Sequence, residues 1–389
     1  MKKTLASLLL LLASIPHMMS AADADPWNTA FSLLDEDLRL QGENPKNTCL
    51  SPLSLQLALG MVNEGAKGKT RSELNSIMPS GNNAMMQMLL DGKCSQLISA
   101  NSIWINSSFA KSMKKKFVKQ NLKHFGAEVQ SKPFGAETVA AINNWCNENT
   151  NGKIPAIIDR LTDDDKMVLV NTLYFKARWI NTFSKSATQP RTFYNSNGSK
   201  TDAMTMEMTA SFKYRETEMF QAVELPFESD FSDGENPVAT SRFELLVILP
   251  KQETGLLEVL DSLKSGKFSL TDSYKRVHLR LPRFRCEYGT SLIPHLQAMG
   301  VSRCFTPAAQ FKGISRTKLL ISEVMQKTFI SVDEDGAEAA AATAVSMRIG
   351  AARPRPEQPI EMYVDRPFIY VITESLTGTP VFVGAITNL

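Results

Sequence analysis

The sequence predicts an α+β protein, because strand-like and helix-like segments follow one another without the regular alternation of a doubly wound sheet. Residues 167–175 read MVLVNTLYF and are apolar on both faces, as expected for a strand at the centre of a sheet. In residues 277–281, apolar residues alternate with His278 and Arg280, which is typical of a strand with one wet face. Further strands are expected at residues 243–250, 277–285, 319–332 and 380–386.

Helices are expected where apolar residues recur every three or four positions, or where a helix-start signal occurs. Pro52 suits the first turn of a helix. Thr70 followed by Glu73 has the spacing of a capping box that opens another helix. Two more helices are expected at residues 140–150 and 290–299. The first helix is predicted from the spacing of Trp27, Phe31, Leu34 and Leu38.

Residues 1–21 are predicted to be a signal peptide. Lys2 and Lys3 precede an apolar run at residues 5–15, and small residues follow at positions 20–22. The run is too short to cross a bilayer, which needs about 20 apolar residues. We expect cleavage after Ala21 and a secreted mature protein, either extracellular or periplasmic, with no membrane span.

Composition restricts the partners that can be expected. The chain is 43% apolar and 21% charged, as in an ordinary globular protein. Removing Lys2 and Lys3 lowers the formal charge from +3 to +1, so the total charge does not favour nucleic acid as a partner. The five cysteines contain no Cys-x-x-Cys pair, and we expect neither a metal nor a cofactor. Buried free thiols are expected, with a single disulfide as the alternative.

No catalytic motif is present. The sequence lacks a Gly-x-Ser-x-Gly elbow, a His-Glu-x-x-His motif, a phosphate-binding glycine loop and a dinucleotide fingerprint. Beyond the signal peptide, the only histidines are His124, His278 and His295. We interpret them as structural or solvated residues rather than general bases, and we do not expect an enzyme.

A run of lysines stands out at residues 111–123. If the segment is helical, Lys116, Lys119 and Lys123 share one face. Two interpretations stay open, a solvated helix face and a weak polyanion site. The run consists of Lys111, Lys114, Lys115, Lys116, Lys119 and Lys123.

Residues 336–348 can be read with the period of a strand. One face then carries only small or apolar side chains, whereas the other is polar at both ends. Alanine also permits a helix or an open loop, so the segment can exist exposed or inserted in a sheet, with Gly336 as the hinge. A surface helix ending near Met347 is the alternative. The small and apolar face carries Ala337, Ala339, Ala341, Thr343, Val345 and Met347.

Several motifs, taken in order and spacing, resemble one family. The hinge EDGAEAAAATAV occupies residues 334–345. The other motifs are SPLS at 51–54, GAKGKT at 65–70, INNW with TNGKI within 142–154, VNTLYFKARW at 170–179, FKGIS at 311–315, DRPFIY at 365–370 and VFVGAI at 381–386. Over essentially all of the mature sequence, the chain is similar to a serpin.

The resemblance implies a single domain at residues 22–389, with three β-sheets, about eight or nine helices and an exposed reactive loop at about residues 333–360. It also implies a monomeric suicide-substrate inhibitor of serine endopeptidases, or secondarily of cysteine endopeptidases. In such an inhibitor the cleaved loop inserts into the large sheet and traps the acyl-enzyme. The alternative is a non-inhibitory ligand carrier or chaperone with the same fold.

The resemblance also assigns site residues. Trp179 corresponds to the tryptophan under the upper opening of the large sheet. The bond Gly350–Ala351 suits an elastase-like protease, and Arg348–Ile349 suits a trypsin-like one. The loop hinge corresponds to Gly336, Ala337, Glu338, Ala339, Ala340, Ala341, Ala342 and Thr343. The polar cluster where the central strands part corresponds to Ser51, Ser54, Asn171 and Gln326, with glutamine in place of the usual histidine.

Overall fold

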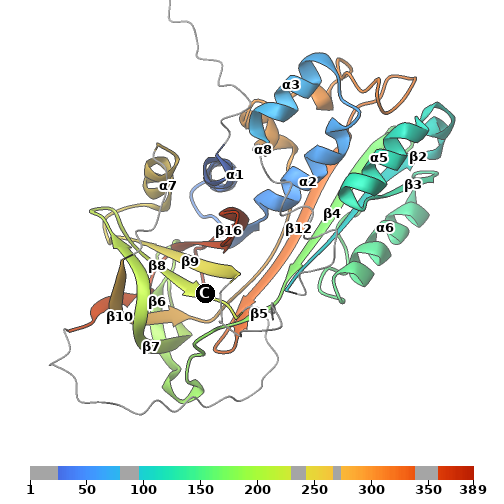
Figure 1. Ribbon diagram of the computed structural model, residues 1–389. Helices are drawn as coiled ribbons and strands as arrows, with labels where there is room; N and C mark the ends of the chain where they lie inside the picture. Colours follow the sequence, from blue (N-terminus) through green and yellow to red (C-terminus); the bar gives the residue numbers. More distant parts are fainter. Residues whose placement is uncertain (1–24, 79–95, 229–241, 266–272, 338–357) are drawn as a thin grey trace, which may run out of the picture.

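The computed structural model describes residues 25–78, 96–228, 242–265, 273–337 and 358–389 (Figure 1). Helices pack against two hydrogen-bonded sheets, so the α+β class is confirmed. Among the described helices, none is both long and apolar enough to cross a membrane.

The seven-stranded sheet contains the strand that the sequence places at the centre. β4 (Met167–Phe175) is buried at all nine positions and has the predicted bounds. It lies between β2 (Leu97–Asn106) and β12 (Glu323–Val332). The remaining strands are β3 (Glu128–Lys132) beside β2, the short β13 (Gly336–Ala337) and β5 (Ala177–Arg178), and β11 (Phe284–Ser291) on the other edge of β12.

The nine-stranded sheet is built around one long strand, β7 (Lys200–Glu216). The first part of β7 pairs with β6 (Gln189–Tyr194) and β10 (Tyr274–Pro282), and its end pairs with β8 (Phe220–Pro226). Two of the three expected sheets are therefore joined through β7. The other strands are β9 (Phe243–Pro250), β15 (Phe368–Glu374), β16 (Thr379–Ile386), β1 (Thr48–Leu50) and the edge strand β14 (Ile360–Tyr363).

Seven α-helices and three short 3-10 helices lie in the described residues. α2 (Pro52–Asn63) is buried at ten positions and packs against both β4 and β16, so it separates the two sheets. α6 (Ala136–Asn149) covers the outer face of β4, where Trp145 packs in one cluster with Val168 and Val170 (Figure 1). The others are α1 (Pro26–Gln41), α3 (Gly68–Ile77), α5 (Lys115–Phe125), α7 (Leu256–Ser265), α8 (Ile293–Ala298), η1 (Ser107–Ser112), η2 (Lys185–Ala187) and η3 (Arg303–Phe305).

Two expectations about local structure are wrong. Thr70 and Glu73 do not form a capping box, because α3 begins earlier, at Gly68. Both side chains instead accept hydrogen bonds from backbone N–H groups far away in the sequence. The Thr70 hydroxyl accepts from Gln310 N at 3.0 Å, and Glu73 accepts from Arg303 N at 2.7 Å. The strand expected at 277–285 is also divided, since the chain passes at Arg283 from β10 in one sheet to β11 in the other.

The four described cysteines are free and buried. Burial raises the pKa of the Cys49 thiol to about 11 and that of Cys146 to about 12. A thiol reacts as its thiolate, so these cysteines are unreactive as nucleophiles at neutral pH. Cys94 lies outside the described residues.

Two carboxylates on neighbouring strands compete for one cation. Lys213 Nζ lies 2.8 Å from Glu224 and 3.9 Å from Glu244, and the buried Glu374 lies nearby on β15. Burial, together with the charge of Glu224, raises the pKa of Glu244 to about 7. Because the folded pKa lies above the ordinary value of 4.5, Glu244 favours folding when protonated. That contribution is lost as the pH rises from 4.5 to 7.

We expect Glu244→Gln to raise the free energy of unfolding at pH 8 by about 2 kcal/mol, because the amide carries no buried charge there. At pH 4.5 the variant and the parent protein should be equally stable. Thermal unfolding at both pH values measures this, with the exposed Glu218→Gln as control. Equal effects of the two substitutions at pH 8 would contradict the assignment.

Candidate reactive-loop insertion site

The beginning of the hinge already lies in the large sheet. After β12, the chain turns and returns as β13, where Ala337 pairs with both Val332 of β12 and Ala177 of β5. Ala337 is 1% exposed and packs in the core, on the side that the strand pattern predicts. The rest of the hinge (338–343) and both bonds expected to be cleaved, Gly350–Ala351 and Arg348–Ile349, lie outside the described residues.

Gly336 is required where β13 enters the sheet. Its φ is 148°, a backbone conformation that side chains with a Cβ rarely adopt. A Cβ added there would lie 2.1 Å from the carbonyl oxygen of Ala177. The close approach of β13 to β5 therefore depends on the missing side chain.

Trp179 holds the turn between β12 and β13. Its indole Nε1 donates to the carbonyl of Asp333 at 2.8 Å, and its backbone N donates to that of Asp335 at 3.0 Å. The ring is 2% exposed and stacks on Phe227 with ring centres 4.3 Å apart. Trp179 therefore lies against the turn that joins β12 to β13.

An ion pair between the exposed Arg283 and the buried Glu334 holds the same turn, and sequence reasoning missed it. Glu334 is 2% exposed and accepts from Arg283 Nη2 at 2.6 Å and from the Thr188 hydroxyl at 2.5 Å. Burial acts to raise the pKa of Glu334, but the hydrogen bonds from Arg283 and Thr188 outweigh it, and the pKa is lowered. The available signal was an arginine at the crossing between two strands.

The lower part of the boundary between β4 and β12 is paired, whereas the part nearest β13 is split. β4 and β12 run parallel and pair over five residue pairs, from Val168 with Glu323 to Thr172 with Lys327. Among the described residues, no ladder joins 173–175 of β4 to 328–331 of β12. β13 occupies the position between the strands at the top. Geometrically, this arrangement can accept an additional strand between β4 and β12.

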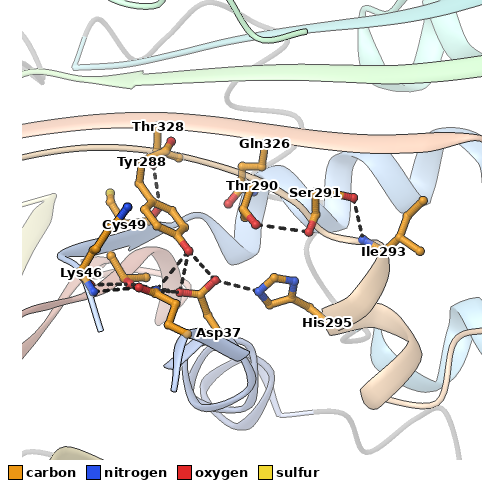
Figure 2. A network of polar contacts seen from close by, with 12 residues as sticks. Asp37, Lys46, Cys49, Tyr288, Thr290, Ser291, Ile293, His295, Gln326 and Thr328 are labelled. Carbon is orange, nitrogen blue, oxygen red and sulfur yellow. Dashed lines mark hydrogen bonds and ion pairs between the residues drawn. The ribbon is translucent and has the colours of Figure 1, made fainter. Parts of the chain in front are cut away.

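Three of the four residues of the expected polar cluster come together behind β12. The side-chain amide of Gln326 bonds both backbone groups of Ser51: its Oε1 accepts from Ser51 N at 2.8 Å, and its Nε2 donates to Ser51 O at 2.9 Å. The Ser51 hydroxyl donates to Val381 O at 2.7 Å and accepts from Ser54 N at 3.0 Å. Figure 2 labels Gln326 on β12.

We call the paired boundary between β4 and β12 the seam. Asn171 lies on β4, on the opposite side of the seam from Gln326. It pairs with Gln326 in the ladder, but its side-chain amide donates to Asn101 Oδ1 on β2 at 2.6 Å. Within the part of the chain that the structure describes, no side-chain hydrogen bond joins Asn171 to Gln326. The seam is therefore held by backbone pairing, and each strand keeps its polar partners if β4 and β12 separate.

A second buried network fastens the β11–β12 side to the helices (Figure 2). Asp37 of α1 is 1% exposed and accepts from the Tyr288 hydroxyl at 2.7 Å, while His295 Nε2 of α8 lies 2.8 Å away. Burial acts to raise the pKa of Asp37, but hydrogen bonds from His295, Tyr288 and Gln41 lower it overall. The network was not expected from the sequence, although Asp37 adjoins Leu38 on the buried side of α1.

The profile of the family described as Serpin (serine protease inhibitor) matches residues 28–389. The chain belongs to the serpin family. This serpin is 35% identical to an uncharacterized serpin-like protein of Thermococcus kodakarensis, with 89% of the chain and 81% of the relative covered. It is 30% identical to Iripin-8 of Ixodes ricinus, with 90% of each covered.

Solved structures agree with the assignment. The crystal structure of Serpin48 from the insect Tenebrio molitor matches with a TM-score of 0.79 at 27% identity, covering 96% of this chain and 100% of that one. The native state of the thermophilic serpin tengpin matches with a TM-score of 0.78 at 26% identity, covering 93% and 94%. The expected family and fold are confirmed.

We expect Gly336→Ala to lower the free energy of unfolding by about 2 kcal/mol, because alanine must adopt a strained backbone and displace β5. Gly255→Ala is the control, since a Cβ there meets nothing within 4 Å. Denaturant unfolding of both variants tests this, and equal midpoints would rule out the steric argument.

Arg283→Ala should destabilise the protein at pH 7 by about 2 kcal/mol, because the buried Glu334 carboxylate loses its hydrogen bonds from the partly solvated arginine. The lowered pKa of Glu334 means that the pair stabilises above pH 4.5 and loses its effect as the pH falls below that value. The difference from the parent protein should therefore shrink at pH 3. Arg285→Ala, at an exposed position of β11, serves as control, and a pH-independent difference would contradict the role of the pair.

Proposed function

We propose that this serpin inhibits an endopeptidase as a suicide substrate by inserting its cleaved loop between β4 and β12. The observation that carries the proposal is the position of Gly336 and Ala337, which already lie at the open upper end of the seam. The small residues at 339–344 support it, because they can follow into the sheet without steric conflict. Serine endopeptidases are the first class proposed, and cysteine endopeptidases the second.

In the proposed reaction, the protease nucleophile attacks the scissile carbonyl, an acyl bond forms, and the amide nitrogen of the next residue leaves with a proton. The segment before the cut is then free at one end. It inserts beside β12, breaking the five residue pairs of the seam and forming ladders with both neighbours. The acylated protease is carried toward the far end of the sheet before water can hydrolyse the acyl bond.

The energies are sufficient for this. Residues 337–350 span about 46 Å as a strand, at about 3.3 Å per residue. A central strand gains about a dozen ladder hydrogen bonds, each worth about 1 kcal/mol net. That gain is comparable to the stability of a typical domain, about 5–15 kcal/mol, so it can distort a bound protease.

The finer assignments are parts of the same proposal. Cleavage at Gly350–Ala351 would fit an elastase-like target, and cleavage at Arg348–Ile349 a trypsin-like one. We propose that residues 1–21 are removed on export and that the secreted domain at residues 22–389 acts as a monomer. Incubation with elastase and trypsin tests which protease class is the target, and the mass of the released C-terminal fragment identifies the cleaved bond.

A carrier function is the second candidate. A cavity of about 580 Å³ lies where the end of α1 approaches the start of α7, and it is lined by Leu38, Leu257 and Arg366. Its size suits a small ligand. An SDS-resistant complex with either protease supports inhibition, whereas simple cleavage without a complex supports the carrier.

Ala341→Arg should convert the inhibitor into a substrate, so that the SDS-resistant fraction falls at least about tenfold while the loop is still cut. Ala337 faces the core, so alternate residues through Ala341 face it after insertion, and an unpaired arginine there costs several kcal/mol. Ala340→Arg is the matched control on the opposite face and should retain inhibition. An equal loss of the SDS-resistant complex in both variants would contradict the proposed strand register.

A further inference from the structure

A polar cavity lies on the nine-stranded sheet, in the part where Figure 1 labels β6, β7 and β10. Its volume is about 340 Å³, at the lower end of the range of small-molecule sites. The wall comes from β6, β7, β10 and β14, together with the residues that directly follow β14. Two arginines line the cavity, Arg191 from β6 and Arg280 from β10.

These two arginines share a single carboxylate. Glu207 of β7 accepts from Arg191 Nη2 at 2.5 Å and from Arg280 Nε at 3.1 Å. The other oxygen of Glu207 lies 2.7 Å from His278 Nε2. Burial acts to raise the pKa of Glu207, but these hydrogen bonds lower it to about 2, so the carboxylate is ionised at neutral pH. Two guanidinium charges therefore meet one carboxylate charge, which leaves a positive charge in excess.

The nearby acidic residues do not remove this excess. Asp365 lines the cavity, but its carboxylate accepts from Arg366 Nη1 at 2.6 Å, so it has a cation of its own. Glu361 lies on β14, across the ladder from His278, and is exposed. Solvent and salt screen the charge of an exposed carboxylate. The cavity thus keeps a positive potential that attracts an anion.

One donor in the wall lacks an acceptor. The Nε atom of Arg191 is shielded from solvent and has no hydrogen-bond partner within the described residues. A shielded donor of this kind costs free energy, because it has lost its hydrogen bonds to water without replacing them. The guanidinium of Arg280 is held in place by Tyr363, since its central carbon lies 4.1 Å from the centre of that ring. An oxygen atom in the cavity would supply the missing acceptor.

We propose that this cavity binds a small oxyanion that carries two negative charges, such as inorganic phosphate or a short dicarboxylate. Guanidinium groups bind phosphate and carboxylate oxygens through several N–H donors in a fixed plane. Arg191 would donate from Nε. Arg280 would donate from its terminal nitrogens, for which the described part of the chain offers no hydrogen-bond acceptor. The proposal does not depend on the inhibitory function.

A bound anion would also hold β14 in the sheet. β14 is an edge strand and pairs with β10 over four residue pairs, from Val277 with Ile360 to Arg280 with Tyr363. The cavity is lined from both sides of this ladder and from β6. The ligand would therefore connect β14 to strands with which it forms no ladder, and exchange of its backbone amides should become slower.

The test is isothermal titration calorimetry of the full secreted chain with inorganic phosphate and, separately, with malonate. Calorimetry is preferred to a thermal shift, because phosphate also stabilises folded proteins that have no site for it. We expect the parent protein to bind at least one of the two with a Kd of about 1 mM or tighter. Arg191→Lys keeps the charge but loses the planar donors, so it should bind at least about tenfold more weakly.

Arg276→Gln is the control, because it removes a full charge from an exposed position of the same strand as Arg280. It should bind as the parent protein does. Arg280→Lys is a second variant with preserved charge and should also bind more weakly. The thermal midpoints without ligand check that each variant is folded.

The two probes separate the possible ligands. Binding of phosphate alone indicates a phosphate site, binding of malonate alone indicates a dicarboxylate site, and binding of both supports the shared oxyanion chemistry. Hydrogen exchange at residues 360–363 should slow at least about threefold with the bound probe.

Four results would overturn the proposal. The first is the absence of saturable binding of either probe. The second is an unchanged affinity in both lysine variants, and the third is an equal loss in Arg276→Gln, because binding would then reflect total charge. The fourth is unchanged exchange at residues 360–363 despite calorimetric binding, because the anion would then lie elsewhere.

Discussion

The parallel pairing of β4 with β12 is the constraint on which the rest of the structure depends. It covers five residue pairs in a sheet whose central strands are nine and ten residues long. The outer neighbours of these two strands are more firmly attached: β4 pairs with β2 over nine positions and β12 with β11 over eight. Each of the two central strands is therefore paired over fewer residues with the other than with its outer neighbour, and the hinge lies at the end of this boundary.

Side-chain contacts follow the same boundary. Gln326 holds the start of α2, and the Asp37 network ties α1, α8 and β11 together, so these elements form one body. Asn171 bonds to β2, and α6 packs on the outer face of β4, so these elements form another. Because the side-chain hydrogen bonds of Gln326 and Asn171 stay within their own bodies, separating the two bodies would break none of these bonds.

Much of this was accessible from the sequence. The bounds of β4 were predicted correctly because a nine-residue run that is apolar on both faces allows few alternatives. The resemblance also named Ser51 and Gln326, which are hydrogen-bonded to each other in the structure. What failed has a common cause. Thr70 and Glu73 were read as local partners, yet they bind backbone groups more than 220 positions away, and the Asp37–His295 pair joins residues 258 positions apart. Local spacing cannot report such contacts.

The seated position of Ala337 has a kinetic consequence. Adding a strand to a sheet is slow mainly because the first contacts cost backbone entropy before enough hydrogen bonds have formed to compensate for it. In this protein those first contacts exist before any cut is made, so insertion would start from a formed nucleus and proceed as a zipper. Loop insertion competes with release of the bound protease. The rate of insertion would then depend on how fast residues 338–350 add to the sheet, and not on how fast the loop finds the gap between the strands.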